Sequence, residues 1–327
     1  MHRSFRTVLP VSLTGLVVAG LLLAQPAQAK LCGDDVDGRD VPCACGDVVV
    51  SDVTLGDDPV VTGPACPQDG LVVRAPEARR PLVIDLHGAT LRGSGAGVGL
   101  RILFGGPGGA RVQSSGGVAT LAGFEDGIAA RGTDSVWLVE DVVVRNSARD
   151  GLRISGPDFT IQRVEVRTAV RDGFALGGRG FRISETRAAD CGRYGYSVMG
   201  DSGQIGQPGA GNIAERSGFA GFSIMGAGHA LADCTAVFGR HSGVHLQAFG
   251  IEVHGCRASD NGGDGIEGMG NSWRMAGNEA LRNAGNGIVV RGVNLLDEGG
   301  NRGADNRGGD RARGAVQCTI GGAACAL

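Results

Sequence analysis

Charged side chains recur beside glycines at near-constant spacing in this chain, and together they could bind an acidic polymer. One group is basic and comprises Arg149, Arg153, Arg171 and Arg193. A second group is polar and comprises His241, His245, Asp264 and Glu267. Guanidinium groups make paired hydrogen bonds to carboxylates, so a row of them suits a ligand with repeated acidic groups. We therefore expect a binding surface formed by Arg149, Arg153, Arg171, Arg193, His241, His245 and Glu267, the alternative being a face that contacts only solvent.

The same region holds residues that a polysaccharide lyase would need. Removing a proton beside a substrate carboxylate requires a cation to neutralise that carboxylate and a base to take the proton. Asp126, Asp150 and Asp172 each precede a glycine, and they could hold calcium, with Arg153 close by. An aspartate before glycine is also typical of turns, in which its carboxylate binds backbone amides. A lysine base is excluded from the repeats, because Lys30 is the only lysine of the chain and precedes them.

Two other chemistries have fewer residues to support them. Hydrolysis of a glycosidic bond needs two carboxyl groups, and Asp264 with Glu267 is the nearest such pair. Copper prefers thioether and imidazole ligands, which makes a row of methionines beside His241 and His245 of interest. Each member of that row stands four residues after a glycine: Met199, Met225, Gln247 and Met269.

All these residues are placed by a repeat of about 22 residues. Ten glycines are each followed by an apolar-x-apolar triplet, at Gly70, Gly99, Gly127, Gly151, Gly173, Gly195, Gly221, Gly243, Gly265 and Gly287. From Gly127 onward the steps are 24, 22, 22, 26, 22, 22 and 22 residues. A fixed period of this size is typical of a solenoid, in which each coil buries its apolar side against its neighbours. The longest step contains Pro208 and Gly209 and predicts a loop that leaves the stack intact.

Within one period, apolar and polar residues alternate in three short stretches. Alternation with a period of two predicts strands that each bury one face. Equivalent residues of successive coils should lie on top of one another, so Phe159 should stack on Phe181. Three strands per coil, all running in the same direction, predict three parallel sheets wound into a prism. The fold class is therefore all-β, a parallel β-helix of about ten coils.

Nine cysteines in an exported chain indicate disulfides. Two groups stand at the ends of the repeats and are expected to form disulfides there: Cys32, Cys43, Cys45 and Cys66, then Cys318 and Cys325. Zinc binding by the first four is the alternative, although their spacing lacks two close pairs. Cys234 and Cys256 lie one coil apart, and we expect them to stack inward as thiols, a bridge being possible but not required.

The N-terminus has the features of an export signal. Arg3 and Arg6 precede an apolar run from Val8 to Leu23, and Ala27-Gln28-Ala29 matches a cleavage site. The expected organisation is a signal peptide at 1–29, a disulfide-containing cap at 30–69, a β-helix at 70–297 and a Gly/Arg-rich cap at 298–327. We expect a secreted or periplasmic protein with no transmembrane segment in the mature chain. The formal net charge of −3 gives no support to nucleic-acid binding.

The repeats resemble those of the right-handed parallel β-helix proteins, the pectate-lyase-like superfamily. Three segments carry a closer resemblance to an exported, carbohydrate-associated group: Cys45 to Val73, the run Asp85-Leu86-His87-Gly88-Ala89-Thr90-Leu91, and Cys318 to Cys325. The second matches that group's Asp-Leu-Asn-Gly-x-Thr-Leu pattern, with His87 in place of Asn. The resemblance covers essentially the whole mature chain and implies the fold and export.

The resemblance implies several activities without choosing one. Relatives include polysaccharide lyases, which use calcium and an arginine or lysine base, as well as glycoside hydrolases, mannuronan epimerases and a periplasmic copper-handling accessory protein. The epimerase signature, Tyr-Gly leading to Asp-Pro-His, departs after Tyr194-Gly195. We therefore expect a module that binds a polysaccharide or cell-surface glycan, or a structural module. The first alternative is a lyase or related enzyme acting on acidic polysaccharide, and the second is a copper-handling accessory protein.

Overall fold

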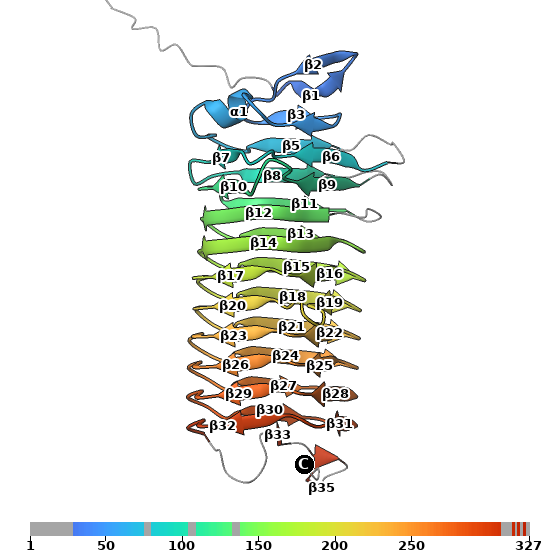
Figure 1. Cartoon of the computed structure of the whole chain (residues 1–327), viewed down its shortest axis with the longest axis vertical. Helices are drawn as coiled ribbons and strands as arrows, with labels where there is room; N and C mark the ends of the chain where they lie inside the picture. Colours follow the sequence, from blue (N-terminus) through green and yellow to red (C-terminus); the bar gives the residue numbers. More distant parts are fainter. Residues whose placement is uncertain are drawn as a thin grey trace, which may run out of the picture.

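The computed structural model describes residues 29–74, 80–103, 109–132 and 138–308, together with the backbone of 316–317, 319–320 and 323–324. These residues wind into a rod of stacked coils, with β1 (Leu31–Val36) near one end and the C-terminal strands at the other (Figure 1). The proposed signal peptide, except its last residue, and Cys318 and Cys325 lie outside the described residues. Within the described part of the chain, no helix is long and apolar enough to cross a membrane.

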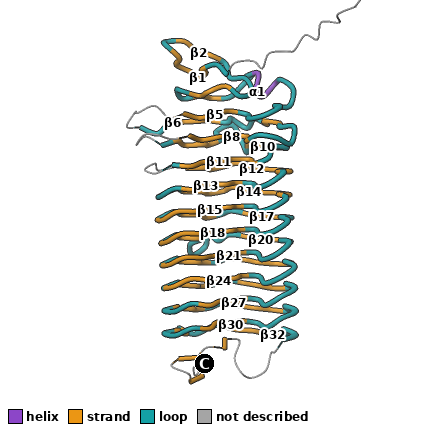
Figure 2. The backbone as a smooth tube through the Cα atoms, turned by 180° about the vertical axis from the view of Figure 1, so that it is seen from behind, coloured by secondary structure: helices purple, strands orange, loops and turns teal. Residues whose placement is uncertain are grey.

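One long face of the rod is a 14-stranded sheet, parallel throughout except where β2 joins its end. Each coil adds one strand, so residues about 22 apart in sequence are neighbours across the sheet, as the stacked turns of Figure 2 show. Its strands in spatial order are β2 (Arg39–Val41), β1, β3 (Asp47–Val49), β5 (Leu71–Arg74), β8 (Val98–Leu103), β11 (Asp126–Arg131), β13 (Leu152–Ser155), β15 (Phe174–Arg179), β18 (Tyr196–Asp201), β21 (Phe222–Ala227), β24 (Val244–Phe249), β27 (Ile266–Met269), β30 (Ile288–Arg291) and β33 (Val316–Gln317).

The other two faces of the predicted prism share one 19-stranded sheet. Two ten-residue strands, β12 (Leu138–Ser147) and β14 (Thr160–Ala169), run around the corner between these faces and belong to both. Besides β12 and β14, one face contains the strands β4 (Val53–Thr54), β6 (Leu82–Asp85), β9 (Ala110–Gln113), β16 (Arg182–Ser184), β19 (Gln204–Ile205), β22 (Ala230–Ala232), β25 (Glu252–His254), β28 (Trp273–Ala276) and β31 (Leu295–Asp297). The other face contains, again besides β12 and β14, the strands β7 (Thr90–Arg92), β10 (Ala119–Ala122), β17 (Arg187–Ala189), β20 (Ile213–Glu215), β23 (Thr235–Val237), β26 (Arg257–Ser259), β29 (Glu279–Leu281) and β32 (Arg302–Ala304).

The corners of the coil are set by residues in the left-handed region of backbone conformation. At the corner that β12 and β14 cross, Asp141 has φ 58° and Arg163 has φ 51°. At the next corner, Asn146 has φ 55° and Asp190 has φ 57°. Asn and Asp tolerate this conformation better than other non-glycine residues, because their short polar side chains bond locally. Repetition of these positions every coil keeps the strands of successive coils in register.

The core is built of identical positions stacked along the rod. Phe159 lies on Phe181 with ring centroids 5.0 Å apart. Tyr196 lies between Phe174 and Phe222, at 4.7 Å and 4.5 Å. These rings are fully or almost fully buried, and burial of a side chain of this size stabilises the fold by about 1.5–3 kcal/mol. The predicted stacking of residues 22 apart is therefore confirmed.

One corner is lined by small or amide side chains that bond along the rod. Asn261 donates from Nδ2 to Oδ1 of Asn283 at 3.0 Å, and Asn283 donates to Asn306 at 2.9 Å. Each amide also donates to a backbone carbonyl of the preceding coil. This ladder satisfies buried polar groups where the chain bends.

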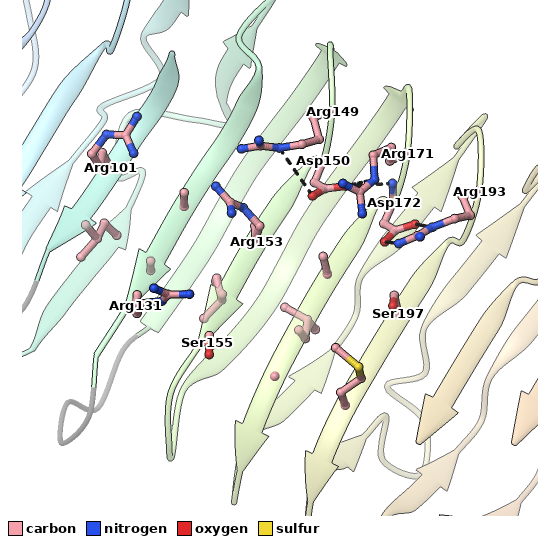
Figure 3. Close-up of a pocket in the computed structure, with 18 of the residues that line it drawn as sticks. Arg101, Arg131, Arg149, Asp150, Arg153, Ser155, Arg171, Asp172, Arg193 and Ser197 are labelled. Carbon is pink, nitrogen blue, oxygen red and sulfur yellow. Dashed lines mark hydrogen bonds and ion pairs between the residues drawn. The ribbon is translucent and has the colours of Figure 1, made fainter. Parts of the chain in front are cut away.

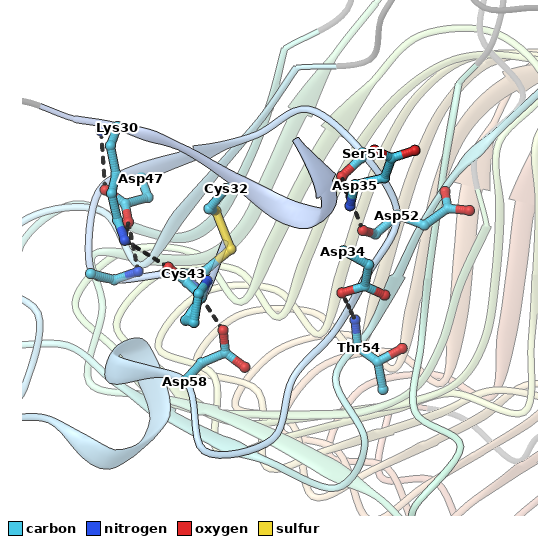
Figure 4. The surroundings of a disulfide bond; sticks show 12 residues. Lys30, Cys32, Asp34, Asp35, Cys43, Asp47, Ser51, Asp52, Thr54 and Asp58 are labelled. Carbon is cyan, nitrogen blue, oxygen red and sulfur yellow. Dashed lines mark hydrogen bonds and ion pairs between the residues drawn. A yellow bond between two sulfur atoms is a disulfide. The ribbon is translucent and has the colours of Figure 1, made fainter. Parts of the chain in front are cut away.

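The N-terminal end is closed by a hairpin, two disulfides and a single turn of helix, α1 (Pro59–Thr62). One disulfide joins Cys32 to Cys43 (Figure 4). A second joins Cys45 to Cys66, so all four predicted N-terminal cysteines are paired. Asp58 supports the first of them by accepting the backbone N–H of Cys43 at 2.7 Å. Because β2 pairs antiparallel with β1, the hairpin covers the terminal strand of the sheet.

A third disulfide lies in the middle of the rod, between Cys234 and Cys256. The expectation of two stacked thiols is therefore wrong for this pair. Both cysteines are fully buried on neighbouring coils, with Cα atoms 4.4 Å apart, and at that separation the side chains can bond to each other. Cys191 is the free cysteine of the described residues and is buried.

The four-residue insertion forms a small loop and does not break the stack. Gln207 and Ala210 make an antiparallel bridge that closes the loop around Pro208 and Gly209. The strand after it, β20, still pairs with β17 on one side and β23 on the other. At the C-terminal end, β34 (Thr319–Ile320) and β35 (Ala323–Ala324) pair antiparallel.

Candidate functional site

A groove of about 570 Å³ lies on the outer face of the 14-stranded sheet, across β8, β11, β13, β15 and β18. Arginine is the most frequent charged side chain in its lining (Figure 3). The arginines are Arg101, Arg131, Arg149, Arg153, Arg171 and Arg193. The structure therefore brings together all four arginines of the predicted basic group and adds two that the sequence did not single out.

Backbone pairing places these arginines in rows. Arg101 and Arg153 occupy outward positions of β8 and β13, on either side of Ala129. Arg149, Arg171 and Arg193 each come two residues before one of the ten glycines that mark the repeat, which we call anchor glycines. The backbone N–H of Arg171 donates to the carbonyl of Arg149, and that of Arg193 to Arg171, both at 2.8 Å. Neighbouring members of this row are therefore about one strand spacing, roughly 4.8 Å, apart at the backbone.

Three carboxylates lie beneath the arginines and are almost fully buried. The exposed fractions of Asp126, Asp150 and Asp172 are 0%, 1% and 1%. Oδ1 of Asp126 accepts the backbone N–H of Asp150, and Oδ1 of Asp150 accepts that of Asp172, both at 3.2 Å. The amide bonding expected of an aspartate before glycine is present, but the amide belongs to the next coil. In these three coils the aspartate directly before the glycine points inward.

Asp126 holds two arginines of the groove. Arg149 donates to it from Nε at 2.9 Å and from Nη2, and Arg153 donates from Nε at 3.1 Å and from Nη2 at 2.7 Å. Burial alone would raise the pKa of Asp126, but the hydrogen bonds from Arg149 and the charges of both arginines lower it below its ordinary value. Asp126 is therefore an ionised group that orients two guanidinium groups.

Asp172 and Asp69 hold one arginine each. Arg193 donates from Nε to Asp172 at 2.8 Å and also from Nη2, while Arg101 donates to Asp69 at 2.6 Å and 2.8 Å. A guanidinium has five N–H donors, and a paired bond of this kind uses two of them. The remaining donors of Arg193 and Arg101 are left for a ligand in the groove.

Asp150 differs from its neighbours because no arginine donates a hydrogen bond to it. The nearest cations are Nε of Arg171 at 3.8 Å and Nε of Arg149 at 3.9 Å. Burial raises the pKa of Asp150 above its ordinary value, and the nearby charges of Asp172 and Asp126 raise it further. Arg171 makes no other ion pair among the described residues, and its side chain is half exposed.

The described residues contain no group of three or more His, Cys, Asp or Glu side chains arranged to hold a metal ion. The stacked aspartates had suggested calcium because their mutual repulsion needs a compensating charge. For Asp126 and Asp172, arginines supply that charge, and hydrogen bonds from arginine and backbone donors engage both carboxylates.

A cluster of rings continues the arginine row and was missed from the sequence. Phe219 and His241 stand two residues before their anchor glycines, as Arg193 does, and their rings stack at 4.2 Å. Tyr194 meets Phe219 edge-on at 5.5 Å, and the Arg193 guanidinium lies 4.9 Å from the Tyr194 ring centre. The side chain of Phe219 is 41% exposed. The sequence contains this signal two residues before each glycine of the repeat, where three arginines are followed by Phe219 and His241.

The predicted polar group is only partly assembled. Glu267 accepts hydrogen bonds at Oε1 from Oγ of Ser242 at 2.6 Å and from Nδ1 of His245 at 2.9 Å. This contact raises the pKa of His245 and lowers that of Glu267. Asp264 instead accepts from the backbone and side chain of Asn286. His245, Asp264 and Glu267 line a hollow of about 100 Å³, whereas His241 belongs to the ring cluster.

The methionine row lies where the sequence places it. Met199, Met225, Gln247 and Met269 pair in register across β18, β21, β24 and β27. Met199 and Met269 are more than half exposed. His245 lies on the same face but is engaged with Glu267.

Several arginines on the other faces of the rod also pair with acidic side chains. Glu279 lies between Arg257 and Arg302 on neighbouring strands and binds them at 2.7 Å and 2.8 Å. Arg282 binds Asp260, which is partly exposed, at 2.7 Å. Glu140 is buried on the other sheet and binds both Arg111 and Arg163, much as Asp126 binds two arginines of the groove. Glu125, which is partly exposed, also pairs with Arg149. The groove differs in that six arginines line it and three of them form a row.

No protein-family model matches this chain, and no curated protein matches its sequence. Its structure is similar to that of a point mutant of the periplasmic alginate epimerase AlgG, with a TM-score of 0.53 and 14% identity over 84% of this chain and 78% of that one. For AlgG itself the TM-score is 0.50, with 13% identity over 77% and 74% of the two chains. For the A-module of the Azotobacter vinelandii mannuronan C-5 epimerase AlgE4 it is 0.47, with 14% identity over 77% and 83%. The fold is thus the right-handed parallel β-helix that the sequence predicts.

Proposed function

We propose that this protein is an exported module that binds an acidic polysaccharide in the arginine groove. The observation that carries the proposal is the row formed by Arg149, Arg171 and Arg193, with Asp126, Asp150 and Asp172 buried beneath it. Asp126 and Asp172 fix the directions of the Arg149 and Arg193 guanidinium groups, while Arg171 keeps all its side-chain N–H donors free of a carboxylate hydrogen bond. A site whose donors are already oriented loses less entropy when a ligand binds.

The repeat of the fold suits a polymer rather than a single small anion. Each coil presents one arginine of the row, so acidic groups that recur along a chain would meet donors that recur along the rod. The ring cluster of Tyr194, Phe219 and His241 extends the same row. Ring faces of this kind pack against the apolar face of a sugar, which an inorganic anion does not offer.

Two further observations support the class of ligand and the export. The structural neighbour is named as a periplasmic enzyme of alginate, an acidic polysaccharide. Three disulfides in the described residues are typical of an oxidising compartment, in line with the export signal expected at 1–29.

Binding fits Arg153 better than the role of a base in a lyase. Both Nε and Nη2 of Arg153 donate hydrogen bonds to Asp126, so these nitrogens carry protons in the structure. A guanidinium held in this way can contact a substrate carboxylate but is poorly suited to accept a proton.

The test is binding of the mature protein to alginate, pectate and a glycosaminoglycan, compared with a neutral glucan, by calorimetry at two ionic strengths. We expect binding to the acidic polymers alone, weakening as salt rises. The double variant Arg153→Gln/Arg171→Gln should lose most of the affinity. It leaves Arg149 on Asp126 and Arg193 on Asp172, so both buried carboxylates keep a partner.

The matched control is Arg187→Gln/Arg257→Gln, which removes the same charge from another face of the rod. Equal loss of binding in both double variants would show a general charge effect and contradict a site in the groove. Formation of an unsaturated sugar product, abolished by Arg153→Ala, would contradict a binding-only function and favour the lyase.

A further inference from the structure

The arginines of the groove differ in how firmly they are already bound. Arg101, Arg149, Arg153 and Arg193 each donate hydrogen bonds to a carboxylate. Arg171 stands in the middle of the row and donates none, since its nearest carboxylate oxygen, on Asp150, is 3.8 Å away. Arg131 also lacks an ion pair among the described residues, but it lies outside the row, toward the far end of its strand (Figure 3).

Of the three buried aspartates, Asp150 is the one to which no arginine donates a hydrogen bond. Its Oδ1 accepts one backbone N–H, and the carboxylates of Asp126 and Asp172 lie on the coils to either side. Asp150 is 1% exposed, so water compensates little of its charge. The groups that face it are these two carboxylates, the guanidinium groups of Arg149 and Arg171, and the backbone amide of Asp172.

We propose that Arg171 is the residue that binds the acidic group of the ligand, and that Asp150 competes with the ligand for it. This inference rests on the proposed function. When Asp150 is ionised, it neutralises part of the charge of Arg171. When Asp150 is protonated, that charge is free for the ligand.

The direction of the pH dependence follows from the competition. A ligand anion beside Asp150 raises the pKa of that carboxyl further, so binding takes up a proton. Affinity should therefore increase as the pH falls from 7 towards the pKa of Asp150. A sulfated dextran is the probe that isolates the effect, because its sulfate groups stay charged throughout this range. Each unit by which the ligand raises the pKa of Asp150 corresponds to a tenfold gain in affinity.

The experiment measures the affinity for sulfated dextran between pH 7.5 and 4.5 for the wild type, Asp150→Asn and Arg171→Gln. We expect the wild type to bind about tenfold more tightly at the acidic end. Asp150→Asn should bind about as tightly at pH 7.5 as the wild type does at pH 4.5, with a flat profile. Arg171→Gln should bind weakly with a flat profile. Arg171 is half exposed, so its variant tests the idea even if Asp150→Asn does not fold.

His241→Gln and Asp260→Asn serve as controls for the other sources of pH dependence. His241 continues the same row, whereas Asp260 pairs with Arg282 on another face. The wild-type profile should persist in both. Loss of the profile in His241→Gln, or its persistence in Asp150→Asn or Arg171→Gln, would overturn the inference. If the wild type bound neither sulfated dextran nor the acidic polysaccharides at any pH, the proposed function itself would fail.

Discussion

Asp172 is almost fully buried, yet it accepts hydrogen bonds from both Nε and Nη2 of Arg193, whose side chain is 44% exposed. The pair therefore joins the core of a coil to its outer surface. Asp126 makes the same connection for Arg149 and Arg153. Charges that a soluble protein would ordinarily leave mobile at its surface are in this way fixed in direction.

Asp126→Asn should destabilise the protein in a pH-dependent manner. The pKa of Asp126 is lowered in the folded state, so its ionised form contributes stability above the ordinary carboxyl pKa, and this contribution is lost as the pH falls through the lowered value. We expect the variant to lose about 2 kcal/mol at pH 7, because a buried pair is broken, and progressively less below pH 4. Urea unfolding at several pH values measures the difference.

Asp260→Asn is the matched control for this prediction. Asp260 also binds an arginine through two hydrogen bonds, but at the surface, where such pairs contribute little. A deficit of Asp126→Asn that stayed constant between pH 7 and pH 3 would show that lost packing, not lost charge, is responsible.

Replacing both Cys234 and Cys256 by alanine should lower the free energy of unfolding by about 3 kcal/mol, as expected for a bridge that closes a loop of this length. The flanking strands β23 and β26 stay paired through their backbones, so the coil should keep its shape. Thermal unfolding followed by circular dichroism measures the loss. Alkylation of the unreduced, unfolded wild type provides a separate check, since reaction at Cys234 and Cys256 would contradict the bridge.

Phe219→Ala should weaken binding of acidic polysaccharide while leaving binding of inorganic polyphosphate, which has no sugar rings, nearly unchanged. The side chain adds ring surface beside Arg193 but carries no charge, so only contacts with the sugar are lost. We expect a five- to tenfold loss, the order of about 1 kcal/mol that an aromatic contact contributes. Calorimetry with an alginate oligosaccharide measures it. Phe238→Ala, an exposed phenylalanine elsewhere on the rod, is the control and should bind normally.

The sequence predicts position along and around the rod well, because each coil repeats the same spacing. Phe159 over Phe181, the amides of Asn261 and Asn283, and the row of Arg149, Arg171 and Arg193 all follow from counting in steps of 22. A period of this kind reports which residues are neighbours. This information depends only on the path of the backbone, which is nearly the same in each coil.

The spacing does not predict side-chain direction at the corners or the bonds between neighbours. The spacing does not show that Asp126 and Asp172 are buried, with arginines bound to them that compensate the cost of burial. Cys234 and Cys256 were placed side by side correctly, yet the choice between thiols and a disulfide depends on a separation that spacing cannot give. The ring cluster was missed because the spacing places Phe219 in the same row as Arg193 but does not show that its ring contacts those of Tyr194 and His241.

The stability of the rod should decline at alkaline pH through two buried groups. Burial raises the pKa of the Cys191 thiol to about 12, and burial also raises the pKa of the Tyr196 hydroxyl, which bonds to Thr186. Above about pH 9 the unfolded chain loses these protons while the folded chain keeps them, so the free energy of unfolding falls as pH rises. Between pH 7 and 10.5 the Cys191 proton alone accounts for about 2 kcal/mol.

Cys191→Ala should remove that share of the alkaline loss. Alanine occupies the equivalent position one coil earlier, at Ala169, so the change fits the corner. Urea unfolding at pH 7, 9 and 10.5 should show the variant slightly less stable than the wild type at pH 7 and more stable at 10.5. Peptide mapping after treatment with iodoacetamide at pH 9 gives an independent readout. The Cys191 peptide should be unmodified in the folded protein, and rapid modification there would mean that the thiol is neither buried nor protonated as the structure indicates.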